Sequence, residues 1–219
     1  ADDMHMAYIP AGAFQMGSED GEDNEKPVHT VELDAFWMDK TEVSNAQFGV
    51  FVDETGYQTE AEEKGSSYIV EGVNLKEVES ADWLHPQGLS SGLINLSDHP
   101  VVHVSWHDAK AYCEWADARL PTEAEWEKAA RGGLEGAAYP WGDDNDGSKV
   151  NSCDANCVSN ANWDDGYAFT SPVANYSPNN YGLYDMAGNL WEWVSDWFSS
   201  DYYAKSPDSN PRGPASGSY

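Results

Sequence analysis

Long apolar runs, basic residues and cysteine are all scarce in this sequence. No apolar run approaches the roughly 20 residues that a membrane-spanning helix needs, so we expect no transmembrane segment. Lysine and arginine total 11 against 39 aspartates and glutamates, which gives a formal net charge of −28. Such a negative field repels phosphate backbones and anionic membrane surfaces, so we expect no nucleic-acid partner.

The three cysteines cannot all pair with one another inside the chain. Cys153 and Cys157 lie close enough in the sequence to form a disulfide, which indicates an oxidising compartment and leaves Cys113 over. The chain starts Ala-Asp-Asp-Met-His-Met, as a processed terminus would. We therefore expect an exported protein (secreted, periplasmic or extracellular) in its mature form after signal-peptide removal.

Aromatic residues are abundant instead. Ten Trp, twelve Tyr and six Phe supply large side chains, so we expect an aromatic, irregular core. Residues 7–18 predict two short strands around a Pro-Ala-Gly turn, and residues 28–40 alternate apolar and polar like a half-buried strand. Residues 58–98 show no clear period and predict a long polar excursion. The tail, residues 199–219, has little apolar content.

Helix starts are marked by a Ser or Thr followed three residues later by an acid or amide, the capping-box pattern. These pairs are Ser44 with Gln47, Ser105 with Asp108, and Thr122 with Glu125. Gly56 and Gly132 end the first and third of these helices in the usual way. Residues 99–106 predict a buried strand before the second helix, whose apolar stripe carries Cys113 as a core thiol. Few helices, short strands and long loops together predict an α+β fold.

The stretch from Asn179 to Trp197 carries the main candidate site. Asp185 and Glu192 lie seven positions apart, with the backbone carbonyls of Gly188 and Leu190 between them. Carboxylates together with free carbonyls are the oxygen ligands that Ca²⁺ prefers. On spacing alone, a surface turn with two solvated acids explains these residues as well.

Four blocks resemble successive segments of one protein family: IPAGAFQMGS, KTEVSNAQFGVFV, HPVVHVSWHDAKAYCEWADARLPTEAEWEKAARGG and YGLYDMAGNLWEW. They are similar to the blocks of the formylglycine-generating enzyme (sulfatase-modifying factor) family, in the same order, over nearly the whole chain. The resemblance implies a single domain over residues 1–219 with that family's C-type-lectin-like α+β fold. It implies low regular secondary structure, long loops and bound calcium.

The resemblance implies two calcium sites as cofactor sites. One is Asp185, Gly188, Leu190 and Glu192, where Asp185 stands at a position that is commonly Asn in the family. The ligands implied for the other site are Asn151, Ser152, Asp165 and Tyr167. The Cys153–Cys157 loop resembles a family variant beside this second ligand set.

The family's enzymes use copper, held by two cysteines, to oxidise a substrate cysteine with oxygen. Those cysteines lie in a C-terminal block that the resemblance places beyond Tyr219, so the chain appears truncated and no catalytic residue can be named. Cys113 matches a family cysteine whose disulfide partner belongs to the same block. We therefore expect either a missing C-terminal segment or a protein partner to pack near Cys113.

Two functions remain open. The first is a non-catalytic, calcium-binding accessory or binding subunit of a larger assembly. The second is a copper-dependent formylglycine-generating oxidase acting on a sulfatase cysteine, if the chain continues beyond Tyr219. The scattered histidines (His29, His99, His103 and His107) are interpreted as structural residues rather than ligands.

Overall fold

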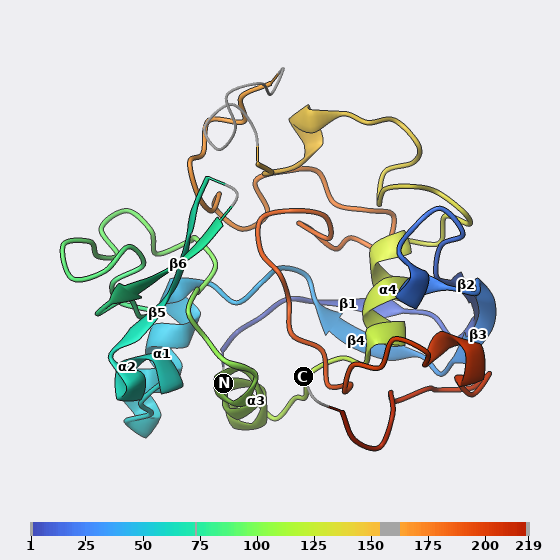
Figure 1. The fold of residues 1–219 in the computed structure, drawn as a ribbon, viewed down its shortest axis with the longest axis horizontal. Helices are drawn as coiled ribbons and strands as arrows, with labels where there is room; N and C mark the ends of the chain where they lie inside the picture. The colour runs from blue at the N-terminus through green and yellow to red at the C-terminus, as the bar shows by residue number, and fades with distance from the viewer. Residues whose placement is uncertain (1, 73, 154–162, 218–219) are drawn as a thin grey trace.

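A long antiparallel hairpin opens the fold in the computed structural model, which describes residues 2–72, 74–153 and 163–217 (Figure 1). It pairs β1 (Met6–Ile9) with β4 (Phe36–Asp39), and β2 (Gly12–Met16) with β3 (His29–Leu33). The register continues unbroken from the first pair to the second, so both pairs belong to one ribbon. The ladder is interrupted at Pro10, which has no N–H to donate. The strands predicted in residues 7–18 are confirmed, and the one predicted in residues 28–40 is divided into β3 and β4.

The three helices predicted from capping boxes are confirmed. They are α1 (Asn45–Thr55), α3 (Trp106–Trp115) and α4 (Glu123–Arg131), and each has both hydrogen bonds of its capping box. Gly56 and Gly132 adopt the left-handed conformation at the ends of α1 and α4. Short 3-10 helices occur at η1 (Asp23–Glu25), η2 (Gly147–Lys149) and η3 (Tyr203–Lys205).

One prediction of local structure was wrong, and another was incomplete. Residues 58–98 contain a short helix, α2 (Glu60–Lys64), and a hairpin of β5 (Ser66–Glu71) with β6 (Asn74–Glu79). This hairpin is exposed over most of its length, so it carries no apolar alternation. Residues 99–106 are not a strand, because His103 has a φ of 59° and the backbone there has left the extended conformation.

Three apolar clusters make up the core. One joins the first strand pair to α4 and Leu183, the second joins the other strand pair to Ala124 and Tyr203, and the third lies around α1 and α3. Tyr203 is buried, so the tail supplies a core residue despite its polar composition. In Figure 1, α1, α2 and the β5–β6 hairpin lie at the left, and α4 with the long hairpin lies at the right. Part of the irregular chain after residue 163 runs between these two groups, and its last part lies beside β2 and β3 at the right (Figure 1).

Candidate functional site

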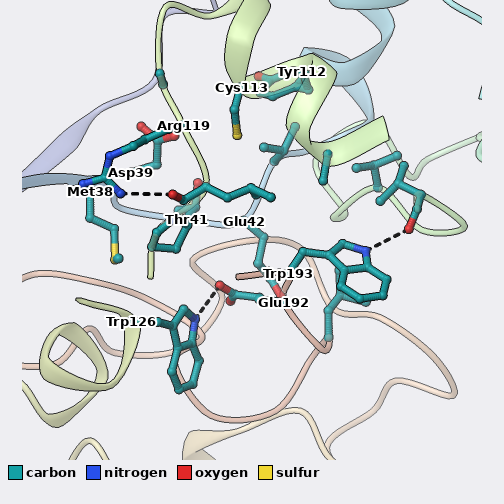
Figure 2. Close-up of a pocket in the computed structure, with 18 of the residues that line it drawn as sticks. Met38, Asp39, Thr41, Glu42, Tyr112, Cys113, Arg119, Trp126, Glu192 and Trp193 are labelled. Atoms are coloured by element: carbon teal, nitrogen blue, oxygen red, sulfur yellow. Dashed lines mark hydrogen bonds between the residues drawn. The ribbon is translucent and has the colours of Figure 1, made fainter. Parts of the chain in front are cut away.

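A cavity of about 540 Å³ lies between β4, residues 101–104, α3 and residues 184–193. Figure 2 shows Cys113, Thr41, Glu42 and Glu192 around it. The side chain of Trp191 is fully exposed at its edge, and Trp37 and Trp193 are also exposed. An open cavity with an aromatic rim can bind an extended peptide segment, because large flat side chains bury area with little loss of conformational entropy.

Cys113 faces this cavity from α3 as a half-buried free thiol. Burial is the largest cause that raises the pKa of this thiol, and the negative charges of Asp39 and Asp2 raise it further, to about 11. Burial and the charge of Asp2 also raise the pKa of Asp39, to about 6. Cys113 is therefore a neutral thiol at neutral pH, and a neutral thiol is a poor nucleophile.

The cavity wall is fixed by hydrogen bonds from tryptophan and arginine. Trp126 on α4 donates its indole N–H to the Glu192 carboxylate at 2.8 Å, and Trp193 donates to the carbonyl oxygen of Val104 at 3.0 Å (Figure 2). Arg119 binds both carboxylate oxygens of Glu125, each at 2.7 Å. Glu192 thus connects the cavity to one of the predicted calcium-ligand loops.

The predicted ligands Asp185 and Glu192 lie close enough to interact electrostatically, and both are close to Glu42. Burial, followed by the charges of Glu192 and Asp185, raises the pKa of Glu42 to about 9. One oxygen of Glu42, Oε1, is buried and accepts no hydrogen bond from the described residues. Asp185 accepts a hydrogen bond from the N–H of Ala174 at 2.8 Å, and burial raises its pKa.

The other predicted ligand set is also brought together. Asp165 accepts hydrogen bonds from the backbone N–H groups of Ser152, at 3.0 Å, and Tyr167, at 2.9 Å. Asn151 is buried and precedes Ser152 in the chain. Among the described residues, no group of three or more His, Cys, Asp or Glu side chains is arranged to hold a metal ion. The predicted sites contain at most two carboxylates each, so their remaining ligands are amide, hydroxyl and carbonyl oxygens.

Asn189 joins the two predicted ligand sets, a role that no sequence pattern predicts. Its backbone N–H donates to the carbonyl oxygen of Asn151 at 2.8 Å, and its Oδ1 accepts from Asn151 Nδ2 at 3.0 Å. Its Nδ2 donates to the Glu42 carboxylate at 2.8 Å. Glu42 was likewise not a predicted site residue. The available signals were an asparagine beside the predicted ligand Gly188 and an acid two residues before the Ser44 cap, and neither pattern is specific.

Two of the histidines that the sequence suggests are structural make contacts with neighbouring polar groups. His99 contacts the Thr170 hydroxyl, and His103 contacts the Ser67 hydroxyl and the Pro86 carbonyl oxygen.

Cys157 lies outside the described residues, so the Cys153–Cys157 disulfide stays a prediction. In the described part of the chain, no helix is both long and apolar enough to cross a membrane.

Comparison with known proteins places this geometry in a family. A family model described as the "Sulfatase-modifying factor enzyme 1-like domain" matches residues 2–218. The formylglycine-generating enzyme of Streptomyces coelicolor is 45% identical over 232 residues, covering 95% of this chain and 74% of that protein. The bovine (Bos taurus) protein named "Inactive C-alpha-formylglycine-generating enzyme 2" is 41% identical over 217 residues, covering 90% of this chain and 72% of that protein.

The formylglycine-generating enzyme of Bos taurus is 44% identical over 235 residues. The match covers 97% of this chain but 63% of that enzyme, so the chain spans less than two thirds of its length. Among solved structures, PvdO from Pseudomonas aeruginosa has a TM-score of 0.76 at 27% identity, covering 99% of this chain and 79% of that one. The chain therefore belongs to the sulfatase-modifying factor family, that of the formylglycine-generating enzymes.

Proposed function

We propose that these residues form an exported, calcium-stabilised domain that binds an extended peptide segment as an accessory subunit and is not itself catalytic. Its fold would be of the C-type-lectin-like kind. The observation that carries the proposal is the open, tryptophan-rimmed cavity that holds one neutral thiol, Cys113. Acidic residues outnumber basic ones in the cavity lining (Asp39, Glu42, Asp117, Glu125 and Glu192 against Lys40 and Arg119), so it favours a neutral or basic peptide over an acidic one.

The described residues fit calcium. Burial and the charges of Glu192 and Asp185 raise the pKa of Glu42, and the charge of Asp185 also acts to raise the pKa of Glu192. One buried oxygen of Glu42 accepts no hydrogen bond from the described residues. A divalent cation beside Asp185 and Glu192 would relieve that repulsion. In the other set, Asp165 and Asn151 would supply side-chain oxygens, and Ser152 and Tyr167 would supply carbonyl oxygens. Calcium would supply structural stability rather than chemistry.

The described residues do not fit copper. Cu(I) prefers a pair of thiolates, and the cavity presents a single cysteine, Cys113. A second candidate function, copper-dependent oxidation of a cysteine to formylglycine, is favoured by the names of the relatives that are 44–45% identical to this chain. That function would need thiolates from outside these residues.

Peptide titration with oxidation analysis tests both candidates. A cysteine-containing neutral peptide and an acidic variant of it are titrated into the chain, with tryptophan fluorescence as the readout. We expect the neutral peptide to bind more tightly, and Trp191→Ala to weaken its binding about tenfold, the effect of losing one well-packed aromatic contact. Trp197→Ala is the control, because Trp197 is exposed but does not line the cavity.

The peptide is then incubated with the chain, copper and oxygen and weighed by mass spectrometry. An unchanged peptide mass supports the binding function. Conversion of its cysteine to an aldehyde would replace that function with the second candidate. If no peptide binds, or if both Trp variants weaken peptide binding equally, the cavity is not the peptide-binding site that we propose.

A further inference from the structure

We propose that Asn189 is a positioning residue that couples the two calcium-ligand loops, so that an ion in one loop strengthens binding in the other. This inference rests on the proposed calcium binding and adds a regulation to it. Asn189 lies between the ligand positions Gly188 and Leu190, and it contacts Asn151 of the other loop through both backbone and side chain. It is not expected to touch either ion.

The hydrogen-bond network fixes the orientation of the Asn189 amide. The N–H of Ser171 can only donate, and it points at Asn189 Oδ1 at 2.9 Å. The Asn189 Nδ2 group then faces the Glu42 carboxylate, which accepts its hydrogen bond. Both ends of the amide are therefore satisfied in one orientation and mismatched in the other.

That orientation in turn fixes Asn151. Because Asn189 presents an acceptor, Asn151 must present its Nδ2, which donates to Asn189 Oδ1 at 3.0 Å and to the carbonyl oxygen of Phe169 at 2.8 Å. The Asn151 amide thus uses its two donors on protein, and its Oδ1 is the atom left to face a cation. Rotation of Asn189 would release one of these donors and free Asn151 to turn.

The second loop is tied to the same residue. The Glu42 carboxylate, which accepts the hydrogen bond of Asn189 Nδ2, also lies within electrostatic reach of Asp185 and Glu192 in this loop. At Gly188 an added Cβ would overlap the Asn151 carbonyl oxygen, so the two loops are packed backbone to backbone. An ion that orders either loop therefore also orders Asn189. The other loop is then already positioned when the second ion binds.

A mutant cycle on metal-stripped protein tests this coupling by calorimetric calcium titration. Asp165→Asn disables the loop of Asn151 and leaves the Asp185/Glu192 site to be measured. We expect D165N to weaken calcium binding at that remaining site at least about fivefold, the lower end of typical coupling. In an Asn189→Gly background, D165N should change the same affinity by less than about twofold. Glycine keeps the positive φ of 59° that residue 189 adopts, so only the side chain is lost.

Two further variants control for folding. Asn210→Gly removes another positive-φ asparagine, hydrogen-bonded to Asp34 far from both loops, and should leave the coupling intact. Asn189→Asp keeps an acceptor for Asn151 and Ser171 but sets a carboxylate against Glu42 in place of the donor, so it should lose part of the coupling. Full coupling in N189D would overturn the role given to the Glu42 contact. The proposal would also be overturned if the protein binds two ions but D165N changes the affinity equally in the wild-type and N189G backgrounds. It would be overturned too if D165N changes the affinity in neither background. A wild-type protein that binds no calcium would overturn calcium binding itself and the coupling with it.

Discussion

Asn151 and Asn189 hold each other twice, once through their backbones at 2.8 Å and once through their side chains at 3.0 Å. They are 38 positions apart in the sequence. Asn151 belongs to one predicted ligand set, and Asn189 lies between Gly188 and Leu190 of the other, so the two loops form one connected structure. This contact makes the stability of both loops depend on the same few hydrogen bonds.

Calcium removal should destabilise the protein. An ion that binds only the folded state stabilises it by about 2.7 kcal/mol at a hundredfold excess over Kd. For a chain of this size, exhaustive chelation should lower Tm by about 5–10 °C per site lost, measured by calorimetry. The double variant D165N/E192Q should show no further change on chelation. An unchanged Tm in the wild-type protein would argue against both sites.

Replacing Gly188 with alanine should force the two loops apart. A Cβ at residue 188 would overlap the Asn151 carbonyl oxygen and the Val150 side chain, in addition to the strain of a φ of 83°. Gly182→Ala is the matched control, because its φ is 81° and nothing lies within 4 Å of its added Cβ. We expect G188A to cost about 1–3 kcal/mol more than G182A in urea denaturation, the usual cost of overpacking. Equal costs would mean that the loop contact contributes nothing beyond backbone strain.

Cys113 should be alkylated slowly at neutral pH and progressively faster up to about pH 11, where its thiol titrates. Only the thiolate reacts, so its rate with iodoacetamide should rise about tenfold per pH unit below that pKa. Asp39→Asn removes a negative charge that raises this pKa, so the variant should react faster at pH 8.5. Peptide mass mapping of the undenatured protein measures both rates. A wild-type rate that stops rising near pH 9 would contradict the raised pKa.

Thr122→Ala should remove the cap of α4 and cost about 1 kcal/mol. The Thr122 hydroxyl accepts the N–H of Glu125, and the Glu125 carboxylate accepts the N–H of Thr122. Thr122→Ser keeps the hydroxyl and should retain most of the stability in thermal melts. If T122S loses as much as T122A, the methyl group rather than the cap is responsible.

The sequence by itself determined the local features of this protein. The capping boxes at Ser44, Ser105 and Thr122 begin helices because a side chain and a backbone N–H only a few residues away satisfy each other. The glycines at the ends of α1 and α4 adopt the left-handed conformation for an equally local reason. The ordered family blocks depend on the same printed residues, and they identified the family.

Tertiary structure decided what depends on residues far apart in the chain. The partnership of Asn189 with Asn151 and Glu42 has no sequence period, because each member comes from a different irregular segment. The left-handed His103 and the exposed β5–β6 hairpin also lack an amphipathic pattern from which they could be predicted. The raised pKa values of Glu42 and Cys113 arise from burial and from charges that folding alone brings near. Composition and spacing cannot specify these neighbours, since electrostatic and packing energies depend on distance in space rather than distance along the chain.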